Sequence, residues 1–167
     1  IFEGVDITGN APEKIALSGL IRSFQITHLF YEMTVTDNML LAIQHFQGEN
    51  ILKSFFRFPS VREKEKVARD KAMELLEFFN ILHLKDEKAK NLSYGQQKLL
   101  SIAMSIMPSP KILLLDEPAA YVNPTLMEKI KKYLTHLNQQ GITIFMIEHN
   151  MKVLMDICKR IYVLNAG

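Results

Sequence analysis

Residues 111–118, KILLLDEP, constrain the fold of this chain more than any other stretch. Four consecutive branched aliphatic residues, 112–115, follow neither the two-residue period of a half-exposed strand nor the 3.6-residue period of an amphipathic helix. A proline follows closely and bounds the run. Such a pattern predicts a short strand that is buried on both faces, as strands of parallel α/β sheets are.

Two carboxylates, Asp116 and Glu117, follow this predicted strand at its carboxyl end. Open α/β sheets bind their ligands at that edge. A buried strand that ends in an acid is the Walker B arrangement, in which the first acid holds Mg²⁺ and the second can polarise water. Taken alone, the stretch is equally compatible with a core strand that ends in a solvated Asp-Glu-Pro turn. The rest of the chain decides between these interpretations.

The composition is typical of a globular protein. A length of 167 residues allows one domain with a sizeable core, and a hydrophobic content of 48% argues against disorder. The net charge is +2 and basic residues alternate with acidic ones, so a nucleic-acid partner is not expected. The single cysteine, Cys158, excludes an internal disulfide, and no apolar run approaches the roughly 18 residues of a membrane span.

Strands and helices alternate in the second half of the chain. Pro124 begins a predicted helix that runs to Gln140 and is closed by Gly141, with Leu126, Ile130, Leu134 and Leu137 facing inward. Strands are predicted at 142–147 and 161–164, with a helix over 151–158 between them. This order implies a parallel sheet.

The first half is predicted to be mainly helical. Residues 34–107 contain helical patterns and almost no strand signal, which predicts a helical subdomain inserted into an α/β core. On the helix over 61–79, the apolar face is assigned to Val67, Ala72, Leu75, Leu76 and Phe79. The predicted elements are a strand at 1–5, a helix over 13–18, a strand at 21–25, and helices over 39–46 with an N-cap among 36–38, over 61–79 and over 96–107.

Five short segments stand in a fixed order along the chain. They are SFQ at 23–25, LSYGQQK at 92–98, LLLDEP at 113–118, AAYVNP at 119–124 and IEH at 147–149. Each segment alone is a weak signal. Together and in this order they resemble the ATPase subunit of ABC transporters, and the resemblance covers essentially the whole chain.

The resemblance gives four residues a role in hydrolysing ATP. Asp116 would bind Mg²⁺ largely through water, because Mg²⁺ keeps several waters and takes few carboxylates. Glu117 would act as general base or orient the water, and His149 would steady the γ-phosphate and that water. Gln25 resembles the Q-loop glutamine, a catalytic residue and a ligand of Mg²⁺. Without the other segments, His149 would be interpreted as an ordinary histidine at the end of a strand.

The segment that contains Ser93, Gly95 and Gln96 resembles the family's signature sequence. A hydroxyl, backbone N–H groups and the positive end of a helix dipole make such a helix start an anion site for phosphate. In the family this site faces the γ-phosphate held by the opposite subunit, so the resemblance implies a dimer. Asn123 would contact the nucleotide from the D-loop, in which Tyr121 and the following valine stand in place of the family's Gly-Leu.

Within the family, the chain resembles the ATP-binding subunits of branched-chain amino acid importers. The segments behind this resemblance are RSFQ at 22–25, LFYEMTV at 29–35, DEPAA at 116–120 and EHNM at 148–151, with Tyr94 replacing the first signature glycine. It implies binding of ATP, a second identical or different ATPase subunit, and permease subunits at the cytoplasmic face of the membrane. The alternatives are a non-transport ABC ATPase and an inert fragment that only binds partners.

Residues 29–35 lie between the Q-loop segment and the predicted helical insert. Adjacent aromatic residues, a methionine and a valine are costly to expose unless the insert or a partner covers them. We expect Phe30 to pack the insert against the core. We expect Tyr31, Glu32 and Met33 to form a groove for a short cytoplasmic helix of the permease, as in the family.

The phosphate-binding pattern G-x-x-x-x-G-K-[ST] occurs nowhere in the chain. We expect it upstream of Ile1, on a strand that the family's sheet order would place between 142–147 and 161–164. The predicted fold is therefore a P-loop NTPase core of the α/β class, truncated at the N-terminus, and the chain alone is expected not to hydrolyse ATP. Its parts are the core at 1–26, the helical subdomain at 27–107, and the core again at 108–167.

Overall fold

A computed structural model of the chain describes residues 1–23, 29–43 and 59–164. The predictions for Gln25 and for the end of the helix at 44–46 lie outside these residues. The helices are α1 (Pro12–Leu17), α2 (Val35–Leu41), α4 (Pro59–Phe78), α5 (Tyr94–Ile106), α6 (Pro124–Gln139) and α7 (Met151–Ile157), with short 3₁₀ turns at Leu82–Leu84 and Ala89–Asn91. The strands are β1 (Leu20–Arg22), β2 (Ile112–Asp116) and β3 (Thr143–Ile147).

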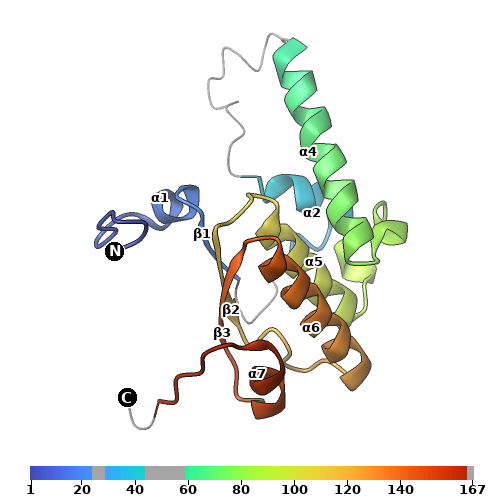
Figure 1. The fold of residues 1–167 in the computed structure, drawn as a ribbon. Helices are drawn as coiled ribbons and strands as arrows, with labels where there is room; N and C mark the ends of the chain where they lie inside the picture. Colours follow the sequence, from blue (N-terminus) through green and yellow to red (C-terminus); the bar gives the residue numbers. More distant parts are fainter. Residues whose placement is uncertain (24–28, 44–58, 165–167) are drawn as a thin grey trace.

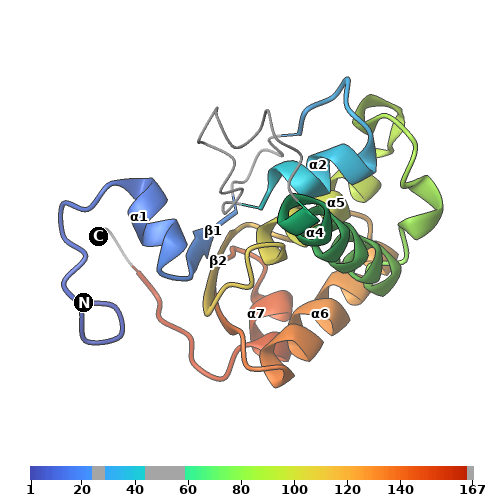
Figure 2. The same cartoon turned by 90° about the horizontal axis from the view of Figure 1, so that it is seen from above.

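The three strands form one parallel sheet, as the sequence predicted, and their order in it is β1-β2-β3. Ile21 pairs with Leu113, and Leu113 pairs with Ile144. Figures 1 and 2 show α4, α5 and α6 on one side of this sheet. The βαβ unit of β2, α6 and β3 places the ends of β2 and β3 side by side at the same edge.

The core lies between the sheet and these helices. Leu113 and Leu115 of β2 are buried, as are Leu100, Ile102 and Ala103 of α5. The predicted inward residues of α6, Ile130, Leu134 and Leu137, are also buried, whereas Leu126 is only partly so. Asn123 caps the N-terminus of α6, and Gly141 follows its end with a φ of 98°, a conformation that glycine adopts at little cost.

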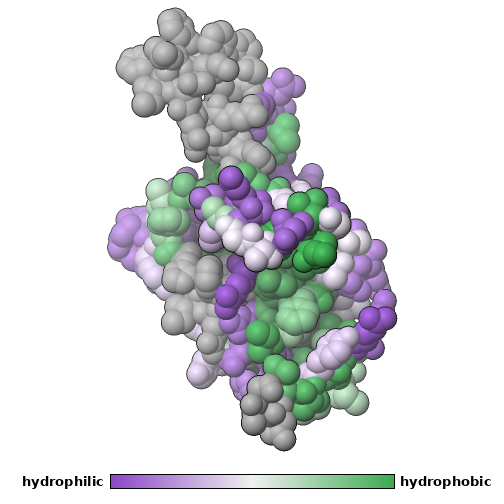
Figure 3. All heavy atoms as spheres, turned by 90° about the vertical axis from the view of Figure 1, so that its left-hand side faces the viewer, coloured by the Kyte–Doolittle hydropathy of each residue, from purple (hydrophilic) through white to green (hydrophobic). Residues whose placement is uncertain are grey.

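The opposite face of the sheet is open in the described part of the chain. Leu114 of β2 is only half-buried, and Phe145 and Ile147 of β3 are exposed. Figure 3 views the molecule from this side and shows apolar side chains gathered on it. The prediction that β2 is buried on both faces is therefore wrong for the face that carries Leu114.

Neither of the terminal strands predicted from the sequence forms. Phe2 and Val5 make an isolated bridge around a tight turn. Residues 161–164 have no regular structure, and Tyr162 is exposed. A strand needs a neighbour to satisfy its backbone groups, and within the described residues β2 is the only strand paired with β3.

Two helices differ from their predicted form. Thr34, rather than a residue among 36–38, caps α2, because its hydroxyl accepts a hydrogen bond from Asp37 N in a capping box. On α4, Val67 is 63% exposed, and the inward stripe is Ala68, Ala72, Leu76 and Phe79. The predicted face contained three of these four positions, but Val67 lies one residue, about 100°, away from the stripe.

Helices α2, α4 and α5 contact one another, as a helical subdomain would. The limits of this subdomain, residues 27 and 107, remain a prediction from the sequence. Leu29 is buried in the hydrophobic core, whereas Phe30 is 55% exposed. The expectation that Phe30 packs the insert against the core is wrong, because more than half of Phe30 faces solvent.

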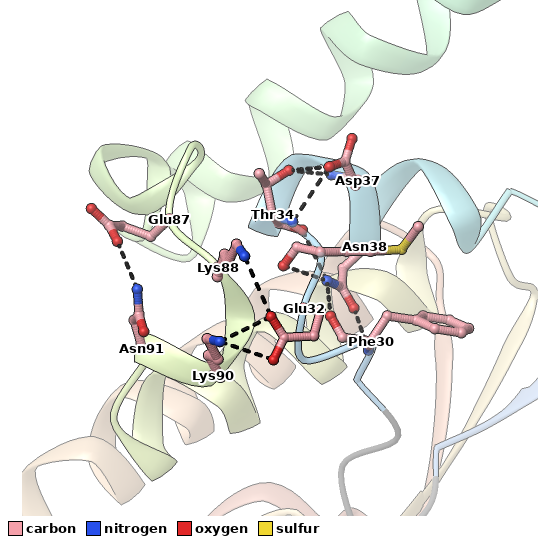
Figure 4. Close-up of polar contacts among 10 residues, drawn as sticks. Phe30, Glu32, Thr34, Asp37, Asn38, Glu87, Lys88, Lys90 and Asn91 are labelled. Carbon is pink, nitrogen blue, oxygen red and sulfur yellow. Dashed lines mark hydrogen bonds and ion pairs between the residues drawn. The ribbon is translucent and has the colours of Figure 1, made fainter.

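A buried amide fixes the segment that follows Leu29. Asn38 has no exposed surface; its Oδ1 accepts from Phe30 N at 2.9 Å, and its Nδ2 donates to the carbonyl oxygens of Phe30 at 3.1 Å and Thr34 at 2.8 Å. Figure 4 shows these bonds converging on the amide from the start and end of the loop. Asn38 thus holds residues 30–34 in one conformation.

We expect Asn38→Leu to lower the free energy of unfolding by roughly 2–4 kcal/mol, because leucine leaves Phe30 N without its acceptor and removes the second hydrogen bond to the carbonyl oxygens of Phe30 and Thr34. Urea denaturation measures the change. The control is Thr34→Ala, which removes a helix cap of α2 and should cost only about 1 kcal/mol. Equal losses in the two variants would contradict a special role for the buried amide.

Candidate functional site

The carboxyl ends of the three parallel strands bring the predicted hydrolytic residues together. Arg22 ends β1 and Asp116 ends β2, where it lies opposite Ile147 at the end of β3. The backbone N–H of Glu117 donates to the Ile147 carbonyl at 2.9 Å, which extends the strand pairing by one residue. His149 follows two residues after Ile147, so both acids and the histidine lie at one edge of the sheet.

Glu117 and His149 contact each other through their side chains. Oε1 of Glu117 lies 3.3 Å from Nδ1 of His149, and the imidazole is well exposed to solvent. Glu117 itself has a φ of 46°, a left-handed conformation that is uncommon for residues other than glycine. A carboxylate and an imidazole so placed can together orient a water molecule beside them and take a proton from it.

Asp116 is paired with a cation from the neighbouring strand. A guanidinium nitrogen of Arg22 lies 3.2 Å from Oδ2 of Asp116. In the described residues, no group of three or more His, Cys, Asp or Glu side chains is arranged to hold a metal ion. The single carboxylate of Asp116 fits Mg²⁺, which takes few protein ligands and completes its shell with water and phosphate oxygens.

The signature residues begin α5 in a capping box. Ser93 N donates to Oε1 of Gln96 at 2.8 Å, and Gln96 N donates to the Ser93 hydroxyl at 3.4 Å. The hydroxyl and the amide are thus engaged with each other's backbone, and a phosphate at this helix start would compete for them. Gly95 packs closely against α6: a Cβ there would lie 2.5 Å from Cδ2 of Leu126, the movable end of that side chain.

The predicted signature and D-loop residues line one cavity of about 560 Å³. Asn123, whose Oδ1 accepts from Leu126 N at 2.8 Å, joins Ser93, Gly95 and Gln96 in its wall. Neither acid of the strand edge belongs to the cavity lining. The residues predicted to bind nucleotide and those predicted to hydrolyse it therefore form two separate groups.

Tyr121 lies at the mouth of this cavity in a left-handed conformation. Its φ is 59° and its side chain is 85% exposed. The backbone here has the conformation that the glycine of the family's pattern adopts easily, and a tyrosine adopts it at a cost of order 1 kcal/mol. Tyr121 thus has a backbone conformation that suits glycine and adds an exposed aromatic ring to the turn.

Sequence reasoning missed three residues of the site. Arg22 was missed because its contact depends on strand order. Lys98 is 3% exposed and donates to the Glu117 carbonyl at 3.1 Å; its position one turn before Ile102 on the buried face of α5 could have identified it. Glu148 accepts from Ala119 N at 2.9 Å, and the sequence holds no signal for that bond.

The buried ammonium of Lys98 is surrounded by carboxylates. Burial lowers the pKa of Lys98, and the nearby charges of Glu148, Glu117 and Asp116 act in the opposite direction. A buried cation is tolerated only where such charges and hydrogen bonds compensate its loss of water. Asp116 and Glu117 therefore lie near the positive charge of Lys98, and Asp116 also pairs with Arg22.

A parallel sheet with two acids and a histidine at its carboxyl edge, next to a helical insert, is the architecture of an ATP-binding cassette. A nucleotide-free ATP-binding cassette from an ABC transporter superposes on the structure with a TM-score of 0.74 and 36% sequence identity, over 93% of this chain and 61% of that chain. A dimeric bacterial ABC transporter cassette gives a TM-score of 0.66 at 26% identity, over 86% of this chain and 57% of that one.

The family model described as ABC transporter matches residues 2–120, and the chain belongs to this family. The high-affinity branched-chain amino acid transport ATP-binding protein BraF of Pseudomonas aeruginosa is 39% identical over 167 residues, which are 99% of this chain and 66% of that protein. Other curated relatives are matched over 63% and 64% of their length. The chain thus spans slightly less than two thirds of these proteins. No helix in the described residues has the length and apolar character to cross a membrane.

We expect Gly95→Ala to change the free energy of unfolding by no more than about 1 kcal/mol, since alanine favours the helix by up to about that amount and the end of Leu126 can move aside. Urea denaturation tests this. In a Leu126→Ala background, where the contact is absent, the same substitution should become more favourable. Identical effects in both backgrounds would show that packing against Leu126 is not what requires glycine.

Proposed function

We propose that this chain carries the hydrolytic residues of an ATP-binding subunit that energises import of branched-chain amino acids through a permease. The observation that carries the proposal is the contact between Glu117 and His149 beside Asp116. The transport function named for BraF, at 39% identity, supports the substrate class. ATP and Mg²⁺ are the proposed cofactors.

The geometry supports a general-base mechanism for the cleavage of ATP. Glu117 would accept a proton from the attacking water, and His149, whose Nδ1 lies 3.3 Å from Oε1 of Glu117, would steady that carboxylate, the water and the γ-phosphate from beside it. Asp116 would hold Mg²⁺, which would supply positive charge to the phosphate oxygens. The Arg22 guanidinium, 3.2 Å from Oδ2 of Asp116, orients this carboxylate at the strand edge. Gln25 remains a proposed ligand of Mg²⁺.

A dimer is supported by the separation of the two groups of residues. Ser93, Gly95, Gln96 and Asn123 line a cavity that excludes Asp116, Glu117 and His149. A phosphate bound at the start of α5 would therefore meet the hydrolytic residues of a second, identical or different subunit. A cassette that shares this fold has been solved as a dimer.

In the ATP-hydrolysing form of the protein, we expect Glu117→Gln to lower kcat by roughly 10²- to 10⁴-fold, because the amide cannot accept a proton, while ATP affinity is retained. Asp116→Asn should instead shift the Mg²⁺ dependence. Phosphate release and equilibrium nucleotide binding measure both. Glu77→Gln, on the exposed side of α4, is the control. Wild-type turnover by Glu117→Gln would place the base elsewhere.

The segment of Tyr31, Glu32 and Met33 is proposed to receive the permease at the cytoplasmic face of the membrane. Both Tyr31 and Met33 are exposed. Their carbonyl oxygens accept hydrogen bonds from Lys90 N and Ala89 N. Glu32 pairs with Lys90 at 2.9 Å and with Lys88 at 3.3 Å (Figure 4). These bonds fix the backbone and leave an aromatic ring and a flexible thioether facing outward, which suits a docking surface.

Tyr31→Ala combined with Met33→Ala should abolish transport while basal ATPase activity and melting temperature stay near wild type. Val67→Ala, which truncates another exposed apolar side chain, is the control. Uptake of labelled leucine, valine and isoleucine per folded molecule is the measurement. Normal uptake by the double variant would place the docking surface elsewhere.

The same uptake assay tests the proposed function. Cells that lack their own branched-chain importer should regain uptake only when this protein and its permease are both present. ATP hydrolysis without any uptake would favour a non-transport ABC ATPase. Absence of nucleotide binding from the assembled protein would favour a role confined to binding partners.

A further inference from the structure

Lys98 is the one buried lysine in the described residues, and the proposed mechanism assigns it no role. It projects from α5, one turn beyond the signature residues Gly95 and Gln96, toward the turn that follows β2. Its side-chain nitrogen lies 3.1 Å from the carbonyl oxygen of Glu117. Burying a charged lysine costs considerable free energy of desolvation. We therefore ask what Lys98 contributes at this position.

Lys98 contacts the carbonyl oxygen of Glu117, a residue whose backbone is strained. Glu117 has a φ of 46°, and such a conformation persists only where the surrounding contacts hold it. Three hydrogen bonds hold Glu117 here: its N–H donates to Ile147, and its carbonyl accepts from Ala120 N at 3.1 Å and from Lys98. Lys98 supplies the charged bond of the three, which is the stronger kind.

The other side of the same turn is held from β3. Glu148, directly after the strand, accepts from Ala119 N at 2.9 Å. Burial lowers the pKa of Lys98, and among the nearby charges that of Glu148 raises it most. Lys98 and Glu148 therefore approach the turn at 117–119 from a helix and from a strand, with opposite charges. Between them runs the backbone that aims the Glu117 carboxylate at His149.

We propose that Lys98 is a positioning residue that, together with Glu148, fixes the turn at 117–119 and so sets the direction of the Glu117 carboxylate. Lys98 acts through its hydrogen bond to the Glu117 carbonyl. Because α5 begins with the signature residues, this contact also ties the signature helix directly to the hydrolytic acid. The catalytic consequence rests on the proposed ATPase function, whereas the fixing of the turn does not.

The test compares Lys98→Met, Lys98→Arg and the double variant Lys98→Met with Glu148→Gln, all in the assembled protein. The first readout is hydrogen exchange of the amides of Ala119 and Ala120. We expect Lys98→Met to accelerate their exchange about tenfold or more, the change that a loss of roughly 1.4 kcal/mol in local stability produces. Lys98→Arg, which keeps a cationic donor, should restore most of the protection. Lys132→Met, at an exposed position on α6, is the matched control and should change nothing.

The second readout is steady-state ATP hydrolysis. Lys98→Met should lower kcat about tenfold or more with KM for ATP unchanged, because a slightly misdirected base impairs the chemical step and spares binding. Lys98→Arg should recover much of that loss. If Lys98→Met folds poorly, the double variant replaces it, since it removes the negative charge of Glu148 together with the positive charge of Lys98.

Unchanged exchange at 119–120 in both the single and the double variant would overturn the proposal. So would a loss of kcat that only matches a loss of folded protein, or a rise in KM at constant kcat. If the wild-type protein hydrolyses no ATP, the proposed function fails, and the exchange readout alone still decides whether Lys98 holds the turn.

Discussion

The parallel pairing of β2 with β3 is the interaction on which the rest of the site depends. Its register sets Asp116 opposite Ile147, and the next backbone bond, from Glu117 N to the Ile147 carbonyl, adds the second acid. A slip of one residue would turn alternate side chains to the other face and separate Glu117 from His149. The buried side chains of Leu113 and Leu115 fix that register, so the hydrophobic core determines the geometry of the charged edge.

The site also contains two features that lower the stability of the fold. Glu117 adopts a left-handed conformation, and Lys98 is removed from water behind it. Each feature alone destabilises the fold, yet the two are joined by one hydrogen bond, so part of each cost is offset by the other. Strain and a buried charge located on the same peptide are typical of functional sites rather than of packing errors.

Features of the fold and the site could be predicted from the sequence where neighbouring residues determine them, and not where distant residues do. β2 and α6 were placed almost to the residue, because an apolar run, Pro124 and Gly141 act within a few positions. The start of α2 was placed too late, since Thr34, Thr36 and Asp37 can all cap a helix and only tertiary contacts choose among them. The roles of Lys98 and Glu148 depend on backbone groups brought near by the fold, which no residue pattern records.

Two positions in the signature and D-loop region show that glycine can be favoured for different reasons. At Gly95 the helix conformation is open to any residue, and an added Cβ would only have to displace Cδ2 of Leu126, which would lie 2.5 Å away. At Tyr121 nothing of that kind excludes a side chain, and only the left-handed backbone disfavours one, by an amount of order 1 kcal/mol. The two positions therefore differ in kind: a side chain at Gly95 would meet a neighbouring side chain, whereas the side chain at Tyr121 is 85% exposed and is disfavoured only by its own backbone.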